Sequence, residues 1–348
     1  MKDLFDYKET IHKCSKCGLC QSVCPNYLET GNECTVSRGL FIMLQGIIKG
    51  DLKPNKTIEK YLDACLKCGK CSEFCPSGID IVQVLLAAKH EFFKRTIKGK
   101  ILSFMQSKLI FNTLLNLLGG KKKNKPFKSE KKVVYFAGCI DKINPKTTSF
   151  AKEILNRIGY EVLEINFNCC GLPFLTSGNL ERFEEQMQEN LKKIEGLEFE
   201  YFVTDCASCQ WAWMEYANYG GNINNIKFKS LYDLIIENNL QFVSKKHKKI
   251  TYHKACHEKT TSAEEIIKNI ENCTYIEMND KDGCCGFANM TNLKQTPIQK
   301  KKKQNIKSTK TKHILTTCVG CVLSINYLLK TNSAKRVIEF LQKECFIK

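Results

Sequence analysis

The sequence predicts an α+β protein of several domains, in which an all-helical N-terminal domain is followed by two α/β domains. Two dense cysteine runs joined by a helical pattern indicate the first domain, and a repeat of alternating strands and helices indicates the other two. The 348 residues, 43% of them apolar, are enough to form these cores. The expected boundaries are 1–96 for the helical domain, 97–132 for an amphipathic helix and basic linker, 133–245 for the first α/β domain and 246–348 for the second.

The N-terminal part is expected to be helical because apolar residues recur every three or four positions between its cysteine runs, as at Leu40, Leu44 and Ile47. Residues 97–118 form a second apolar-rich helical stretch, and residues 119–132 are typical of an exposed linker. The lysines around this stretch make it a basic amphipathic helix, which can lie on an anionic membrane or pack against a protein surface.

The rest of the chain is an internal repeat, whose two units begin with the strands VVYFAG at 133–138 and KITYHKA at 249–255. Further strands are expected at 161–165 and 201–205 in the first unit, and at 273–278 and 313–317 in the second. Helices are expected near 147–158, near 179–196 and after Cys209, then near 262–271, over a lysine-rich segment, and near 320–330. Such alternation predicts parallel sheets, which bind ligands where strands end and helices begin.

The net charge of +18 lies in two patches. Residues 89–132 hold 13 basic and two acidic residues, and residues 291–313 hold eight lysines and no acidic residue. Only five of the 54 basic residues are arginine, the residue that readers of base edges favour, and no nucleic-acid-binding motif accompanies the patches. The sequence therefore predicts no nucleic-acid partner.

The charged N-terminus leaves no room for the apolar core of a signal peptide, and no run approaches the ~18 apolar residues of a membrane span. We therefore expect a cytoplasmic protein, with peripheral attachment to the inner face of the membrane as an option for the basic helix. The 21 cysteines would be kept reduced in that compartment, so metal ligation is the leading explanation for them.

Eight cysteines form two copies of the bacterial ferredoxin run C-x2-C-x2-C-x3-C-P. In such runs, one loop directs three thiolates to one cubane cluster, while the fourth cysteine reaches its neighbour. One [4Fe-4S] cluster is thus assigned to Cys14, Cys17, Cys20 and Cys75, and the other to Cys65, Cys68, Cys71 and Cys24. Structural zinc does not account for a doubled run that ends in proline. Arg38, in the insert between the runs, is expected either against a cluster or on the surface at a helix start.

Ten further cysteines form two sets of five in the same order. Each set has a single cysteine, a Cys-Cys-Gly triplet and a C-x2-C pair. The first set is Cys139, Cys169, Cys170, Cys206 and Cys209, and the second is Cys256, Cys284, Cys285, Cys318 and Cys321. Adjacent cysteines cannot easily share one tetrahedral ion, but they can ligate different irons of an opened cluster. Zinc sites and redox-active thiols are the alternatives.

These motifs closely resemble the family of iron-sulfur oxidoreductases with cysteine-rich CCG domains, over nearly the whole chain. That family includes the iron-sulfur subunits of glycolate and lactate oxidases and of anaerobic glycerol-3-phosphate dehydrogenase, together with the cluster-binding subunits of heterodisulfide reductases. The resemblance implies a dicluster ferredoxin domain followed by two CCG domains, with up to one noncubane [4Fe-4S] cluster in each CCG domain. Thr260 and Cys318 depart from the glycolate-type pattern, which often has histidine and asparagine there.

No dinucleotide, phosphate-loop or flavin fingerprint occurs in the sequence, so the chain is interpreted as an electron conduit. The resemblance implies an electron-transfer subunit of a respiratory dehydrogenase. A partner carrying FAD would oxidise lactate, glycolate or glycerol 3-phosphate, and electrons would pass toward quinone or a membrane-bound acceptor. The alternative is a catalytic subunit that reduces a disulfide at noncubane clusters, as heterodisulfide reductases do.

Overall fold

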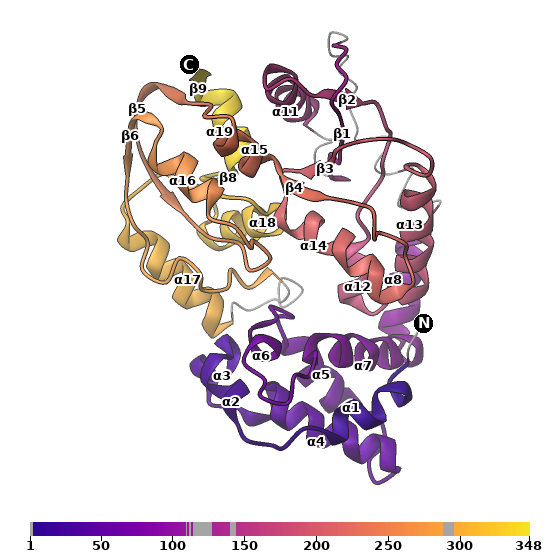
Figure 1. Cartoon of the computed structure of the whole chain (residues 1–348). Helices are drawn as coiled ribbons and strands as arrows, with labels where there is room; N and C mark the ends of the chain where they lie inside the picture. The colour runs from indigo at the N-terminus through magenta and orange to yellow at the C-terminus, as the bar shows by residue number, and fades with distance from the viewer. Residues whose placement is uncertain (1–2, 109, 111–112, 114–126, 140–143, 288–295) are drawn as a thin grey trace. The chain divides into compact units, whose positions relative to one another are not determined.

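The computed structural model describes residues 3–108, 110, 113, 127–139, 144–287 and 296–348 (Figure 1). The chain forms two compact units, and each unit contains segments from more than one part of the sequence. The first unit consists of Met1–Ser107, Pro173–Phe183 and Gly283–Lys302, and the second of Lys108–Leu172, Glu184–Asp282 and Lys303–Lys348.

The N-terminal part of the first unit is helical, as expected. Its α-helices are α1 (Lys8–His12), α2 (Leu19–Val23), α3 (Pro25–Thr30), α4 (Ser37–Lys49), α5 (Lys56–Ala64), α6 (Lys70–Glu73), α7 (Ile81–Arg95) and α8 (Ile97–Met105), with the 3-10 helices η1 (Phe5–Tyr7) and η2 (Glu33–Thr35). Apolar faces of α4, α5 and α7 form the core, through residues such as Leu44, Leu62 and Val84. Asn55 and Asp80 cap the N-termini of α5 and α7 with their side chains.

The helical stretch expected over 97–118 is interrupted in the described residues, because α8 ends at Met105, and residues 108, 110 and 113 are helical again. Gln106 leaves the helix and bonds to another segment of the unit. Its carbonyl oxygen accepts a hydrogen bond from Nε of Arg182 at 3.2 Å, and its side-chain oxygen accepts one from Nδ2 of Asn179 at 2.9 Å. Residues 109, 111–112 and 114–126, which include most of the expected linker, lie outside the described residues.

The segment Pro173–Phe183 contacts α7 within the first unit through a tight turn at Gly178, between α12 (Leu172–Ser177) and α13 (Leu180–Lys192). The Gly178 carbonyl oxygen lies 2.8 Å from Nδ1 of His90 on α7. A Cβ atom at Gly178, whose φ is +94°, would lie 2.8 Å from the Lys89 carbonyl oxygen. Only glycine fits so close an approach of two backbones.

The second unit contains two sheets of the same topology. The first is fully parallel in the order β2-β1-β3-β4, and the second runs β6-β5-β7-β8 in parallel with β9 antiparallel to the start of β5. The strands are β1 (Lys132–Tyr135), β2 (Glu161–Leu163), β3 (Tyr201–Thr204), β4 (Phe228–Ser230), β5 (Phe242–Tyr252), β6 (Glu271–Tyr275), β7 (His313–Thr316), β8 (Ala334–Arg336) and β9 (Cys345–Ile347).

Helices of the second unit connect successive parallel strands, and one apolar core includes residues from both sheets. The helices are α11 (Pro145–Arg157), α14 (Ala207–Glu215), α15 (Leu231–Glu237), α16 (Ser262–Lys268), α17 (Pro297–Ser308, which begins in the first unit), α18 (Val319–Leu329) and α19 (Val337–Glu344), and η3 (Tyr216–Tyr219) is a 3-10 helix. Helix α11 contacts α19, and α15 contacts α16. The shared core includes Val133 and Leu155 of the first repeat and Ile250 and Phe340 of the second.

The structure confirms the predicted fold class, with a helical N-terminal part and parallel α/β content in both repeats. Each strand expected from the repeat is present. The helix expected after Cys209 instead begins at Ala207, so that Cys209 lies inside α14. None of the described helices is long and apolar enough to cross a membrane.

Candidate metal centres

One cavity of the first unit is lined by Cys14, Cys17, Cys20 and Cys75, which come from both ferredoxin-type runs, and also by Cys71. Lys16, with φ of 59°, and Gly18, with φ of 86°, turn the loop between the first cysteines of the run. Helix α2 starts directly after Gly18 and carries Cys20. The structure therefore brings together the four residues that the sequence assigns to one cluster.

A second cavity is lined by the other four cysteines, Cys24, Cys65, Cys68 and Cys71. Its loop repeats the same turn, with Lys67 at φ of 54° and Gly69 at φ of 82°. Cys71 lines both cavities, which makes them neighbours. Groups bound in the two cavities would therefore be neighbours.

Burial raises the pKa of the Cys68 thiol to about 11 and that of the Cys71 thiol to about 12. Thiols in such surroundings stay protonated at neutral pH unless a positive charge stabilises the thiolate. Iron supplies that charge, and metal binding releases the protons. The donor set of the second cavity therefore fits an iron-sulfur cluster, for which four thiolates are the usual ligands.

Arg38 fulfils both of its expected alternatives, because it lies in the first turn of α4 and also lines the first cavity. Its Nη2 donates to both carboxylate oxygens of Glu33 at 2.7 Å. The positive charge at the edge of the first cavity is therefore paired with a negative one.

The first five-cysteine set lies together in the second unit, at the edge where β1, β2 and β3 end. Hydrogen-bond contacts join the side chains of the set in the order Cys139, Cys169, Cys170, Cys209 and Cys206. All except Cys139 are buried. Hydrogen bonds from Cys169 and then Cys209 lower the pKa of Cys170 to about 6, whereas the pKa of Cys209 lies well above its usual value. A buried group of mutually bonded sulfurs is a donor set suited to iron or zinc.

Two buried polar side chains, Asn190 and Tyr216, hold the backbone of the adjacent residues Cys169 and Cys170. Nδ2 of Asn190 donates to the Cys169 carbonyl oxygen at 2.7 Å and to the Tyr216 hydroxyl at 2.8 Å. The Tyr216 hydroxyl donates in turn to the Cys170 carbonyl oxygen at 3.0 Å. Both carbonyl groups of the cysteine pair are therefore fixed by side chains from other elements, which orients the two thiols.

The structure divides the second five-cysteine set between the two units. Cys256, Cys318 and Cys321 belong to the second unit, and Cys284 and Cys285 to the first. Cys318 immediately precedes α18, as Cys206 precedes α14 in the first repeat.

His253 adds a nitrogen donor beside this set. Its Nδ1 lies 3.0 Å from the Lys281 carbonyl oxygen, which fixes the proton on that nitrogen. Its buried Nε2 has no hydrogen-bond partner among the described residues, and a nitrogen of the ring lies within 4.8 Å of the Cys321 sulfur. The corresponding residue of the first repeat is Phe136, so the two sets differ in their surroundings.

The two C-x2-C pairs meet inside the second unit. The Cys206 thiol is in hydrogen-bond contact with Cys318, and the Ser208 hydroxyl lies 2.9 Å from the Cys318 sulfur. The same hydroxyl lies 3.2 Å from Nδ1 of His257, whose ring stacks on Trp211 with centroids 4.4 Å apart. Ser208, which belongs to the first repeat, thus links His257 to the Cys318 sulfur, and both of these belong to the second repeat.

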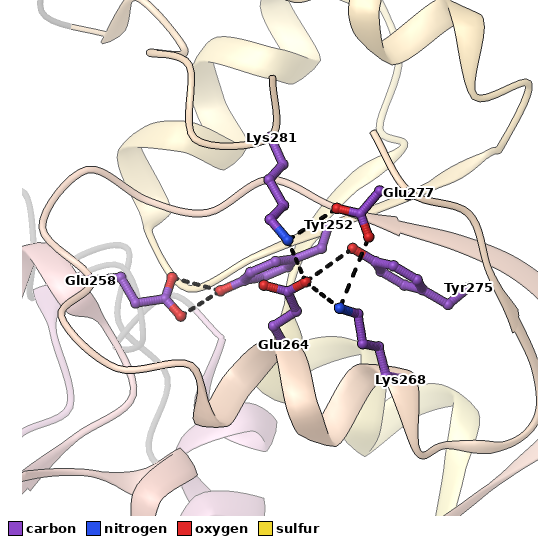
Figure 2. A network of polar contacts seen from close by, with 7 residues as sticks. All are labelled: Tyr252, Glu258, Glu264, Lys268, Tyr275, Glu277 and Lys281. Atoms are coloured by element: carbon purple, nitrogen blue, oxygen red, sulfur yellow. Dashed lines mark hydrogen bonds and ion pairs between the residues drawn. The ribbon is translucent and has the colours of Figure 1, made fainter. Parts of the chain in front are cut away.

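A carboxylate network supports the loop that carries Cys256 (Figure 2). The Tyr252 hydroxyl lies 2.6 Å and 2.5 Å from the two carboxylate oxygens of Glu258, which also accepts a hydrogen bond from Thr317 at 2.9 Å. Burial raises the pKa of Glu258. Because Glu258 follows Cys256 by two residues and Thr317 precedes Cys318, these bonds connect the backbones that hold two cysteines of the set.

The second half of the network in Figure 2 lies around Glu264. Glu264 accepts from Lys281 at 2.6 Å and pairs with Lys268 at 2.7 Å, and Lys281 also pairs with Glu277 at 3.0 Å. These contacts tie α16 to the chain that follows β6 and leads toward the second Cys-Cys-Gly triplet.

Cysteine spacing identifies the candidate ligands but none of the residues that orient them. Asn190, Tyr216 and Ser208 follow no motif, and only their folded positions show their roles. His253 and Lys67 carry a weaker signal in the repeats: His253 stands where the first repeat has Phe136, and Lys67 stands beside a cysteine as Lys16 does.

Two family models match the chain. The model of the 4Fe-4S dicluster domain matches residues 10–79, and the cysteine-rich CCG domain matches twice, over residues 133–213 and 250–326. The chain therefore belongs to the iron-sulfur proteins that join a 4Fe-4S dicluster domain to cysteine-rich CCG domains.

Relatives across nearly the whole chain include the probable glycolate oxidase iron-sulfur subunit of Bacillus subtilis, 24% identical over 93% of this chain and 90% of its own length. A subunit of the fumarate reductase (CoM/CoB) from Methanothermobacter marburgensis is 25% identical over 92% of this chain and 69% of its own length. Lactate utilization protein A of Bacillus cytotoxicus is 26% identical over 56% of this chain and 90% of its own length.

Among solved structures, the crystal structure of a hypothetical protein from Helicobacter pylori matches with a TM-score of 0.53 and 10% identity, over 87% of this chain and 67% of that one. This likeness concerns the fold alone. The relatives named as a glycolate oxidase iron-sulfur subunit and as a fumarate reductase subunit support an electron-transfer role in an oxidoreductase for this chain.

Proposed function

We propose that this chain is the electron-transfer subunit of a respiratory dehydrogenase. A flavoprotein partner carrying FAD oxidises a 2-hydroxy acid such as lactate or glycolate, or glycerol 3-phosphate, and the chain passes the electrons toward quinone or a membrane-bound acceptor. The observation that carries the proposal is the pair of neighbouring cavities, in which the four cysteines assigned to each cluster lie together and Cys71 lines both.

In this proposal, each cavity holds one cubane [4Fe-4S] cluster, the first on Cys14, Cys17, Cys20 and Cys75 and the second on Cys24, Cys65, Cys68 and Cys71. The first five-cysteine set holds a noncubane cluster on Cys139, Cys169, Cys170, Cys206 and Cys209, and the second set holds another on Cys256, Cys284, Cys285, Cys318 and Cys321. The bound clusters supply one-electron redox chemistry. The chain's own residues fix the thiolates and keep water from the buried sulfurs. The proposed domain division remains 1–96, 97–132, 133–245 and 246–348.

Iron and acid-labile sulfide analysis of the anaerobically purified chain tests the ligand sets. We expect roughly 8 to 16 iron atoms per chain with equal sulfide, and iron loss in Cys17→Ser and Cys68→Ser. Cys34→Ser is the matched control because Cys34 belongs to neither kind of motif. Zinc in place of iron, with no visible charge-transfer absorption, would contradict the proposal.

Electron transfer itself is tested with a flavoprotein of the lactate or glycolate type. We expect the reduced flavoprotein to reduce the clusters, and we expect Cys170→Ser and Cys285→Ser each to abolish onward transfer to a quinone analogue. If Cys285→Ser leaves iron content and transfer unchanged, the second five-cysteine set is scaffold and not a redox centre.

A second candidate function is reduction of a substrate disulfide at the five-cysteine sets. It is favoured by the contact between Cys206 and Cys318, which places sulfurs of both sets side by side, and by the Ser208 and His257 side chains next to them. Turnover of a low-molecular-weight disulfide with a reduced viologen dye distinguishes the two functions, since a conduit alone shows none.

A further inference from the structure

The two cubane cavities are built by the same turn, and the lysine of that turn lines each of them, but the two lysines differ in burial. In the first loop the sequence is Cys14-Ser15-Lys16-Cys17, and in the second it is Cys65-Leu66-Lys67-Cys68. Both lysines adopt the left-handed backbone conformation, with φ of 59° and 54°. Lys16 is exposed, whereas Lys67 is only 8% exposed. Because the backbone turn is the same in both loops, the comparison concerns the burial of the lysine side chain.

Lys67 is buried without an acidic partner among the described residues. Its Nζ donates one hydrogen bond, to the Cys65 carbonyl oxygen at 3.0 Å, and the residue lines the second cavity. Lys89, which is also buried in the first unit, in contrast forms an ion pair with Asp63. A buried ammonium group is costly unless a negative charge compensates it.

The group proposed for the second cavity is the negative charge that Lys67 lacks. A [4Fe-4S] cluster on four thiolates is a dianion when oxidised and a trianion when reduced. A fixed cation beside it stabilises the trianion more than the dianion, and it acts strongly where the site is shielded from water.

We infer that Lys67 is a positioning residue that selectively raises the reduction potential of the cluster held by Cys24, Cys65, Cys68 and Cys71. Lys16 has no such effect on the other cluster, because solvent screens its exposed charge. Arg38 at the first cavity is paired with Glu33, so its charge is largely offset. The inference rests on the proposed cubane clusters. It concerns which of the two clusters is reduced more easily because of the side chains around it.

The test is a potentiometric titration of the full-length, cluster-loaded protein, followed by electron paramagnetic resonance. We expect Lys67→Met to reduce the equilibrium constant for reduction of one cubane cluster at least tenfold, which for one electron is a fall of about 59 mV. Lys67→Arg should keep the potential close to that of the wild type, and Lys16→Met, the matched control, should move neither cluster. An unchanged potential in Lys67→Met, with both clusters intact, overturns the inference.

Lys67→Gln is a second neutral variant, for the case in which Lys67→Met does not assemble the second cluster. It retains a hydrogen-bond donor for the Cys65 carbonyl but carries no charge. A lowered potential in this variant supports the electrostatic role. If both neutral variants lose the second cluster while Lys67→Arg retains it, Lys67 is needed for assembly and the inference is overturned. Absence of two cubane clusters in the wild type is a separate result, which contradicts the proposed function itself.

Discussion

Asn190 illustrates how a single side chain can determine the geometry of a candidate metal centre. It is buried and hydrogen-bonds to the Cys169 carbonyl and to Tyr216, which in turn bonds to the Cys170 carbonyl. Two adjacent cysteines must direct their sulfurs to different atoms of one centre, and the orientation of the peptide between them decides whether they can. The hydrogen bonds to both carbonyls therefore matter for ligation as well as for stability.

We expect Asn190→Ala to lower the iron content of the first five-cysteine site and to destabilise the second unit by about 1–3 kcal/mol, because the Cys169 carbonyl loses its buried partner. Iron analysis and denaturant unfolding measure the two effects. Asn218→Ala is the control, since Asn218 is exposed and bonds to Glu215 in its own turn. Equal iron content in both variants would show that Asn190 does not orient the cysteine pair.

Candidate ligands could be predicted from the sequence because their spacing is dictated by short loops. Cys14, Cys17 and Cys20 come from one turn, and the remote Cys75 follows from the doubled run. Supporting residues could not be predicted in this way. Asn190 and Tyr216 are 26 residues apart and reach the cysteine pair only through packing of α13 and the turn after α14. No local pattern records a contact of that kind.

At the scale of elements, six strands were predicted, including the three-residue edge strand β2, whereas β4, β8 and β9 were not. Strands β1, β5 and β7 contain apolar runs that the repeat made visible. Strands β4 and β8 have three residues each and precede α15 and α19. Unlike β2, which was predicted from the run at 161–165, neither lies in a longer run typical of a strand, so their pairing to β3 and β7 becomes apparent only in the folded sheet.

Helix α8 presents an unusual apolar surface. Ile97, Ile101, Phe104 and Met105 are all exposed, with Phe104 71% accessible. Lys94 and Lys100, both exposed, lie next to them. An apolar face bordered by cations is suited to the interface of an anionic membrane or to an acidic partner surface.

If α8 attaches the chain to a membrane, the protein should sediment with vesicles that contain anionic lipid, and the bound fraction should fall as salt rises. Phe104→Glu should remove most of this binding, because it places a negative charge in the apolar face. Leu28→Glu is the control, since Leu28 is 61% exposed on α3, outside this surface. If neither variant changes the binding, α8 is not the surface that binds the membrane. If the wild type does not bind, attachment through a partner is favoured.

The carboxylate network around Glu264 gives a prediction with a defined pH dependence. Burial raises the pKa of Glu264, but hydrogen bonds from Lys268 and Lys281 outweigh it and leave the pKa below its ordinary value. A carboxyl group whose pKa is lowered on folding stabilises the fold above its unfolded pKa, and the stabilisation is lost as pH falls through the folded value.

We therefore expect Lys281→Met to destabilise the second unit by about 1 kcal/mol at pH 7, and less as the pH falls below about 4. Thermal unfolding at a series of pH values measures the difference from the wild type. Lys348→Met is the control, because its pair with Glu271 is similarly short but exposed. A deficit that stays constant down to the lowest pH would mean that Lys281 acts through packing and not through its charge.

At the scale of the whole molecule, the chain does not divide into units in sequence order. Each Cys-Cys-Gly triplet leads into a segment that belongs to the helical unit, Pro173–Phe183 after the first and Gly283–Lys302 around the second. This exchange could not be predicted from the sequence, because both segments have ordinary helix and loop composition. Contacts such as that of His90 with Gly178 arise between residues 88 positions apart.

Within the second unit, a buried ion pair joins the two repeats. Nη1 of Arg336, at the end of β8, lies 3.1 Å from Oδ2 of Asp205, at the end of β3, and both side chains are at most 1% exposed. Asp205 directly precedes Cys206, and the pair therefore connects the second repeat to a candidate ligand of the first. Removing one partner of a buried pair leaves the other charge uncompensated, which typically costs about 3–5 kcal/mol.

We expect Arg336→Met to lower the stability of the second unit by about 3–5 kcal/mol. We also expect less iron at the first five-cysteine site, because Asp205 would recruit water or move, and Cys206 would move with it. Denaturant unfolding and iron analysis of the purified chain measure both. Arg157→Met is the control, since Arg157 pairs with Glu153 on the surface of α11 and should cost little. Adding Asp205→Asn to Arg336→Met should restore part of the stability, because the buried charge is then gone. A double variant no more stable than Arg336→Met would show that the arginine acts by filling volume, and the two repeats would then be joined by their shared apolar core alone.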